Sequence, residues 1–145
     1  MAVITKVSPL APNSFPDLPV IKGVRFATAA AGVKYQGRTD VMLAVADPGS
    51  SVAGVFTKSA TRAAPVLDCQ SKVGKSSDAG LAILVNSGNA NAFTGKFGRA
   101  SVEAITAALA DLADMPTDRV FTSSTGVIGE PRSEEHTSEL QSPCN

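Results

Sequence analysis

The sequence has few of the residues on which catalysis and metal binding commonly depend. Its 145 residues include no tryptophan, one tyrosine, one histidine and two cysteines. The histidine, His136, and one cysteine, Cys144, lie close to the C-terminus. Residues 1–131 therefore contain no histidine and one cysteine, Cys69. This part cannot form a Ser-His-Asp or Cys-His device or a His-containing zinc site, and one thiol cannot build a thiolate cluster.

Charge and hydrophobic run length exclude two more classes. Thirteen Lys and Arg balance thirteen Asp and Glu, so there is no electrostatic case for nucleic acid or an anionic membrane. No apolar run approaches the roughly 18 residues that a membrane span needs. The N-terminus has neither a secretory signal pattern nor a transit-peptide composition. We expect a soluble, cytoplasmic protein with no metal, no nucleic-acid partner and no membrane segment.

Composition divides the chain into three segments. Residues 1–20 carry four of the nine prolines, which predicts an extended lead-in. Residues 21–131 hold most of the aliphatic residues and predict one folded domain. Residues 132–145 read RSEEHTSELQSPCN, and the first eleven resemble the translation of a widely used sequencing-library adapter. We expect this tail to be a sequencing-adapter artefact and exclude it from site arguments.

Apolar runs and turn residues predict several strands. Val24–Ala29 and Val41–Ala46 are short apolar segments, and strong turn residues follow the second at 47–50. We expect Ser51–Thr57 to pair with Val41–Ala46 as an antiparallel hairpin. Gly80–Asn86 is apolar throughout and is expected to be buried on both faces.

Two helices complete the expected fold. Ala63–Lys75 is expected to be helical after Pro65. Ala100–Met115 has apolar residues at spacings of three and four and ends before Pro116. A further strand is expected over Arg119–Thr122. Strands mixed with two helices predict an α/β sandwich.

The segment Asn86–Lys96 is glycine-rich and lies between an expected strand and an expected helix. Such a loop could cradle phosphate. However, Ala90 stands where a P-loop has its first glycine, and Phe97 stands where Ser or Thr should follow the lysine. A tight bend held by asparagine side chains is the favoured interpretation.

A second expected loop, Thr122–Gly129, has four consecutive hydroxyl residues followed by Gly126. It could direct a hydroxyl and backbone N–H groups to one point, as an oxyanion hole requires. Composition alone favours an ordinary Ser/Thr turn or a helix N-cap.

Five sequence blocks, in this order along the chain, carry a resemblance to a known family. They are Gly32–Asp40 (GVKYQGRTD), Val52–Thr57 (VAGVFT), Ala63–Val66 (AAPV), Val85–Gly95 (VNSGNANAFTG) and Ser124–Pro131 (STGVIGEP). Taken together, these blocks resemble the ornithine acetyltransferase family, the bifunctional glutamate N-acetyltransferases of arginine biosynthesis. Phe93 departs from many members, which have cysteine there.

The resemblance implies a fold and a chemistry. The fold is a layered α/β sandwich like that of the self-processing threonine-nucleophile enzymes, with 21–131 as the N-terminal part of the α chain. A threonine freed by self-cleavage takes the acetyl group of N-acetylornithine and passes it to glutamate in a ping-pong reaction. Thr125 and Gly126 match the positions that form the oxyanion hole. The Met-Ala-Thr cleavage site has no counterpart here, because the neighbours of Ala27-Thr28 and Ala60-Thr61 do not match it.

The resemblance also implies partners. These are a β subunit cut from the same precursor, a heterotetramer of two α and two β chains, and substrate-binding residues beyond Pro131. It implies no cofactor, and it leaves open whether acetyl-CoA is a co-substrate. We expect this chain alone to be inactive. The alternatives are a self-processing aminopeptidase-like hydrolase, a nucleotide-binding module using Gly88–Gly95, and a truncated chain without independent function.

Overall fold

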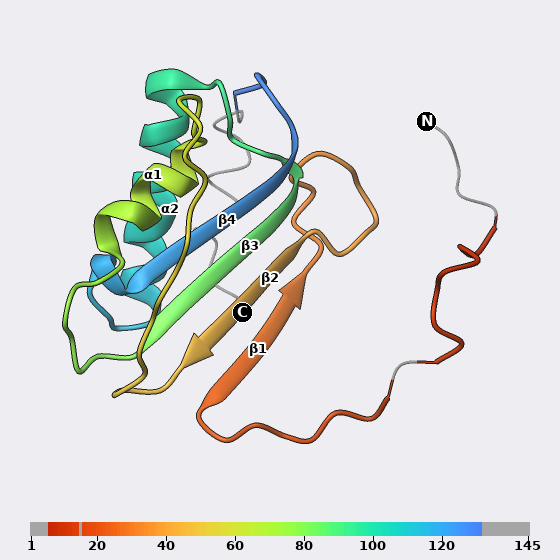
Figure 1. The fold of residues 1–145 in the computed structure, drawn as a ribbon, viewed down its shortest axis with the longest axis horizontal. Coiled ribbons are helices and arrows are strands. Elements are labelled where there is room, and N and C mark those ends of the chain that lie inside the picture. The colour runs from red at the N-terminus through yellow and green to blue at the C-terminus, as the bar shows by residue number, and fades with distance from the viewer. Residues whose placement is uncertain (1–5, 15, 132–145) are drawn as a thin grey trace.

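The computed structural model describes residues 6–14 and 16–131. The tail expected to be an artefact, 132–145, lies outside the described residues. Residues 6–14 and 16–22 contain no helix or strand and extend away from the folded body (Figure 1). Several aliphatic side chains on this segment are exposed, with Leu10 at 92% and Val20 at 94%.

The body of the chain is built on one mixed sheet of four strands. They are β1 (Val24–Ala29), β2 (Val41–Ala46), β3 (Leu81–Asn89) and β4 (Val120–Val127), in the order β1-β2-β3-β4. The pairs β1–β2 and β2–β3 are antiparallel, and β3–β4 is parallel. A parallel pair needs a crossover connection, which the long helix between β3 and β4 supplies.

The first two strands have the bounds that their apolar runs predict. The predicted hairpin involving Ser51–Thr57 is wrong, because β2 pairs with β1 on one side and β3 on the other. With both edges of β2 occupied, this segment forms no strand. It instead packs Val52 and Phe56 onto the core.

The two predicted helices are present with shifted bounds. Helix α1 spans Ala64–Lys72 with Pro65 in its first turn, where a missing N–H is tolerated. Helix α2 spans Gly95–Leu112 and buries the apolar stripe that defines its inner face. It begins five residues before the predicted start, and a short 3-10 turn, Thr117–Arg119, leads from it into β4.

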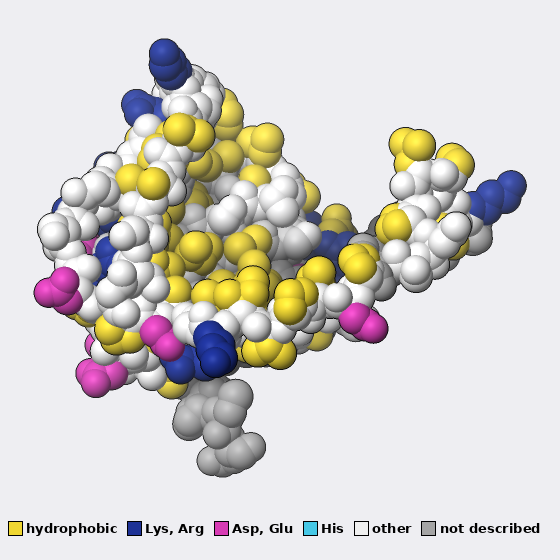
Figure 2. All heavy atoms as spheres, turned by 60° about the horizontal axis from the view of Figure 1, so that its bottom comes forward, with side chains coloured by type: hydrophobic (Ala, Val, Ile, Leu, Met, Phe, Trp, Pro, Cys, Tyr) yellow, Lys and Arg dark blue, Asp and Glu magenta, His cyan; other side chains and the backbone are white. Residues whose placement is uncertain are grey.

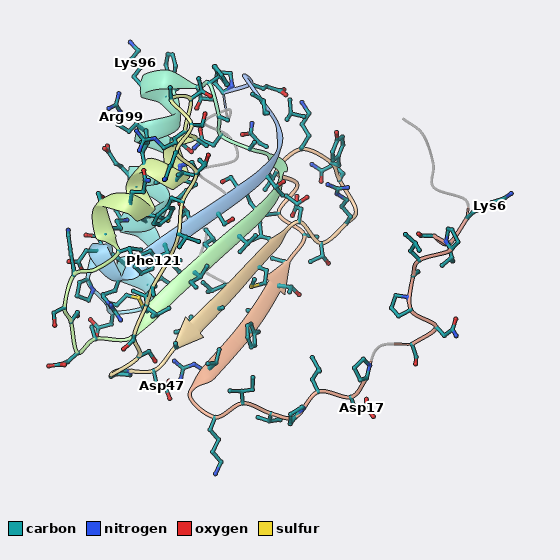
Figure 3. The ribbon with its side chains drawn as sticks, viewed as in Figure 1. Lys6, Asp17, Asp47, Lys96, Arg99 and Phe121 are labelled. Atoms are coloured by element: carbon teal, nitrogen blue, oxygen red, sulfur yellow. The ribbon has the colours of Figure 1, made fainter. Side chains whose placement is uncertain are left out.

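The core forms two clusters on opposite sides of β3 and β4. On one face, α2 packs against the sheet. On the other face, α1 and the segment after β2 contribute Cys69, Val52 and Phe56 around Phe121, which Figure 3 labels beside the helices. The first cluster comprises Ala82, Leu109, Ala110 and Val120, and the second comprises Cys69, Leu81 and Phe121.

Helix α1 also lies along the outer edge of β4. Lys72 Nζ donates to the Val120 carbonyl at 3.0 Å, and Cys69 Sγ donates to the Thr122 carbonyl at 3.3 Å. Lys72 also pairs with Asp68 at 2.7 Å. The side chains of α1 thus satisfy backbone carbonyls that an edge strand would otherwise leave exposed.

The other side of the sheet is more open. Within the described ranges, no strand pairs with the outer edge of β1, and most of its residues are exposed. Phe26 is 66% exposed, and Figure 2 shows hydrophobic side chains gathered across a hollowed face of the molecule. The predicted burial of Gly80–Asn86 on both faces holds for Leu81, Ala82 and Asn86, while the residues at 83–85 are half-buried. No helix of the described part is long and apolar enough to cross a membrane.

Candidate functional site

The candidate site lies at the carboxyl ends of the two parallel strands, β3 and β4. The predicted loop Thr122–Gly129 is mostly strand, because β4 continues through Val127. Thr125 and Gly126 therefore lie near the C-terminal end of β4. They pair with Ser87 and Gly88 of β3. Both are exposed, so their polar groups are accessible at the surface of the chain.

Close backbone contact fixes the position of Gly126. Its φ of +131° is one that L side chains rarely adopt. A Cβ here would stand 2.7 Å from the Asn89 nitrogen and closer still to the Gly88 carbonyl. Gly88 in turn has φ +120°, and a Cβ on it would stand 2.7 Å from Lys34 Cβ. Glycine is needed at both positions because a methyl group on Gly126 would overlap the β3 backbone and one on Gly88 would overlap Lys34.

Three asparagines organise the turn between β3 and α2. Asn86 donates to the Asn89 carbonyl at 2.9 Å, and the side-chain oxygen of Asn89 accepts from the Asn91 amide at 2.7 Å. Asn91 donates to the Gly98 carbonyl at 3.0 Å and accepts from Thr94 Oγ1 at 2.7 Å. The amides therefore bond to the protein itself, as the tight-bend interpretation of this segment predicts.

The chain after Gly126 is held against this turn. The Val127 carbonyl accepts from the Ala90 amide at 2.9 Å, and the Gly129 amide donates to the Ala92 carbonyl at 2.8 Å. The Glu130 carbonyl accepts from Asn89 Nδ2 at 2.8 Å. Three hydrogen bonds thus hold the residues that follow the Thr125–Gly126 pair against the turn after β3.

The connection between β1 and β2, residues 30–40, packs beside the site. Asp40 is buried, and its carboxylate accepts from the amides of Ala31 at 2.7 Å and Val33 at 2.6 Å. Next to this turn, Lys34 Nζ contacts the Glu130 carboxylate at 2.6 Å. The segment between β1 and β2 is therefore tied to the segment after β4.

Helix α1 contributes to the electrostatics of the site. Lys72 contacts Val120 and Cys69 contacts Thr122, so α1 runs antiparallel to β4. Its N-terminal end is directed toward the carboxyl end of β4, where the positive end of a helix dipole favours negative charge. By contrast, Lys96 and Arg99 point outward from the start of α2 (Figure 3).

The arrangement offers hydroxyl and backbone N–H donors rather than an acid–base pair. Among residues 6–14 and 16–131, no three His, Cys, Asp or Glu side chains gather to form a metal-binding cluster. Preorganised donors next to a positive helix end are suited to stabilising a developing oxyanion.

Sequence reasoning singled out Thr125 and Gly126 but missed the supports around them. The Lys34–Glu130 contact joins residues far apart in the sequence, and no local pattern signals such a pair. Asp40 ends the matching block Gly32–Asp40, but nothing in that block shows that its carboxylate accepts from the backbone amides of Ala31 and Val33.

The mixed sheet and its helices match solved structures of one enzyme class, the ornithine acetyltransferases. The chain resembles the ornithine acetyltransferase of Mycobacterium tuberculosis, solved in complex with ornithine. The TM-score is 0.69 with 35% identity, over 83% of this chain and 65% of that one. It also resembles the arginine biosynthesis bifunctional protein argJ of Bacillus halodurans, with a TM-score of 0.73 and 34% identity, over 83% of this chain and 62% of that one.

Residues 25–142 match the model of the ArgJ family, and the chain belongs to that family. It is 71% identical over 135 residues to the arginine biosynthesis bifunctional protein ArgJ of Ruegeria pomeroyi, covering 93% of this chain and 33% of that protein. The Nitrobacter winogradskyi protein of the same name is 54% identical over 129 residues, covering 88% of this chain and 31% of that protein. The chain therefore spans about a third of the length of the curated relatives that it matches.

Proposed function

We propose that the full-length protein carrying this chain transfers an acetyl group from N-acetylornithine to glutamate, giving ornithine and N-acetylglutamate. One observation carries the proposal. In a member of the ArgJ family, an exposed Thr125–Gly126 pair lies at the carboxyl end of β4 with its backbone held by close contacts. The relative from Mycobacterium tuberculosis, named for this activity and solved with ornithine, supports the substrate class.

In this proposal, Thr125 and Gly126 form the oxyanion hole. The Thr125 hydroxyl and the Gly126 amide donate hydrogen bonds to the acetyl oxygen as negative charge develops on it. The tight approach of Gly126 to Gly88 supports this role, because donors that cannot reorient incur no reorganisation cost during the reaction. Removing one such donor typically lowers kcat by about 10²–10³.

The nucleophile is a threonine outside this chain, released by self-cleavage and activated by its own α-amine. This chemistry fits residues 1–131, which contain no histidine. The acetyl group passes through an acetyl-threonine intermediate, so ornithine leaves before glutamate reacts. The assembly is a heterotetramer of two α and two β chains in the cytoplasm, and acetyl-CoA is a candidate second acetyl donor.

A chimera tests the proposal. Residues 1–131 of this chain replace the matching segment of the Ruegeria pomeroyi protein, and transfer from N-acetylornithine to glutamate is assayed beside the unaltered Ruegeria protein. We expect both to be active, Thr125→Ala to lower kcat about 10²-fold or more, and Thr125→Ser to retain most of it. Thr28→Ala, an exposed threonine three strands away on β1, is the matched control.

The two parts of the proposal can fail separately. A folded chimera that shows no transfer while the Ruegeria protein is active would overturn the assigned function. An active chimera that tolerates Thr125→Ala as well as Thr28→Ala would overturn the oxyanion role. Transfer by the 145-residue chain on its own would contradict the assignment of the nucleophile to another part of the protein.

A further inference from the structure

The buried side-chain amide of Asn86 lies on β3 next to the Thr125–Gly126 pair. Asn86 is 7% exposed and is the β3 residue that pairs with Ser124 of β4. Ser124 Oγ donates to Asn86 Oδ1 at 2.6 Å, while Asn86 Nδ2 donates to the Asn89 carbonyl at 2.9 Å. One side chain therefore links the last residues of β4 to the turn that follows β3.

The hydrogen bond between Asn86 and Ser124 affects the Thr125–Gly126 pair through the backbone of β4. Ser124 immediately precedes Thr125, so the orientation of Ser124 sets the direction in which the Thr125 side chain leaves the strand. On the other side of Thr125, Gly126 has no room to move toward Gly88. A strand held at both flanking residues keeps the hydroxyl and the amide between them in one arrangement.

We propose that Asn86 is a positioning residue for the oxyanion donors. The Oδ1 atom of Asn86 holds Ser124, its Nδ2 atom holds the Asn89 turn, and the two bonds together fix the direction of the Thr125 hydroxyl and the Gly126 amide. This inference rests on the proposed acetyl transfer, because it assigns Asn86 a purpose within the same site. Asn86 does not touch the substrate and acts through Ser124.

A positioning role has a distinct kinetic signature. Donors that stabilise charge only in the transition state affect kcat, whereas substrate binding is left largely unchanged. Misplacing such a group by about 1 Å can cost about 10²-fold in rate. Loss of Asn86 should therefore lower kcat with little change in KM. A merely structural residue would lower the amount of folded enzyme without this split.

The experiment uses the active chimera of the preceding section and a double-mutant cycle of Asn86→Leu and Ser124→Ala. Each single variant is expected to lower kcat about 10- to 100-fold, with KM for N-acetylornithine within about twofold of the unsubstituted value. The double variant is expected to be no worse than the poorer single one, because both remove the same bond. Asn86→Asp keeps an acceptor for Ser124 and is expected to recover part of kcat.

Thr106→Val is the matched control for loss of a buried polar group. Thr106 is 4% exposed, and its hydroxyl donates to the Glu103 carbonyl within α2. It should lower the melting temperature without changing kcat per folded enzyme. A second readout needs no activity. In the 145-residue chain, hydrogen exchange at the Ala90 amide, which donates to the Val127 carbonyl at 2.9 Å, should speed up in Asn86→Leu and not in Thr106→Val.

The outcomes separate this inference from the proposed function. If the unsubstituted chimera is inactive, acetyl transfer fails, and the exchange rates still decide whether Asn86 holds the pair. If the chimera is active but Asn86→Leu and Ser124→Ala leave kcat unchanged, or combine additively, the positioning role is overturned. Unchanged amide exchange in Asn86→Leu would also contradict it.

Discussion

Gly126 lies directly opposite Gly88 in the parallel pairing of β3 and β4, and neither position has room for a side chain. Both glycines have positive φ values, +131° and +120°, and the absence of a Cβ on Gly126 lets the two backbones approach at the end of the sheet. The contact extends to Lys34, which packs against Gly88 from the connection between β1 and β2. Three segments far apart in the sequence therefore meet at the residue proposed to donate to the oxyanion.

Gly126→Ala should destabilise the chain by about 2–4 kcal/mol, because the new methyl group would overlap the Gly88 backbone at a φ unfavourable for alanine. Urea unfolding of the 145-residue chain measures the loss. Gly49→Ala is the matched control, since Gly49 has φ +84° with nothing within 4 Å of an added Cβ. The control carries only the backbone penalty, about 1–2 kcal/mol. Equal losses in the two variants would contradict the close-approach argument.

Lys72→Met should lower the free energy of unfolding by about 1–3 kcal/mol. Lys72 has 9% of its side chain exposed, pairs with Asp68 and donates to the Val120 carbonyl. Its removal leaves the Asp68 carboxylate and the Val120 carbonyl without this hydrogen-bond donor where little solvent can replace it. The control is Arg25→Met, because the Arg25–Asp47 pair is 72% and 50% exposed and should change stability little. Equal stability of the two variants would show that the bonds to α1 do not stabilise the β4 edge.

The Cys69 thiol should give stability a dependence on alkaline pH. Burial raises the pKa of this thiol above its ordinary value of 9.0, and the nearby Asp68 charge adds to the rise, against the smaller opposing effects of a backbone interaction with Thr122 and of the Lys72 charge. The unfolded thiol therefore loses its proton first as the pH rises, and the unfolded state gains stability above about pH 9. The contribution is fully present below that pH.

Urea unfolding of the wild type and of Cys69→Ala between pH 7 and 10 measures this effect. The difference in stability between them should be constant at neutral pH and shrink above about pH 9. In a Cys144→Ser background, Ellman's reagent should label folded Cys69 more than about tenfold slower than the unfolded chain. Rapid labelling of the folded chain, or a difference independent of pH, would contradict the burial of this thiol.

The sequence predicted the elements whose signals are local. The apolar runs over Val24–Ala29 and Val41–Ala46 gave the observed bounds, because hydrophobic runs bounded by turn residues determine short strands directly. The pattern predicts a start of α2 at Ala100, five residues late, because glycine disfavours helices and α2 begins at Gly95. Gly98 lies within the first turns nonetheless, since a Cβ there would stand 3.0 Å from Thr94 Cβ and closer still to Asn91 Oδ1.

The errors came from pairing, which is not local. Nothing within Ser51–Thr57 shows that both edges of β2 are already occupied by β1 and β3. The hydroxyl-rich stretch after Phe121 has the composition of a loop, yet pairing with β3 keeps it extended through Val127. Thr125 and Gly126 were identified by resemblance to a family, and their oxyanion role stays a prediction. Their supports, Asn86 and Lys34, became visible only once the strands were paired.

The position of α1 along β4 limits how copies of this chain can associate. A sheet with two open edges can recruit further strands on both sides and polymerise into a fibril. Here Lys72 and Cys69 bond the Val120 and Thr122 carbonyls at the start of the β4 edge, which leaves β1 as the more open edge in the described part. Two copies meeting through β1 would be related by a two-fold axis, with α1 at both outer margins of the joined sheet. Edge-to-edge growth would end at that pair.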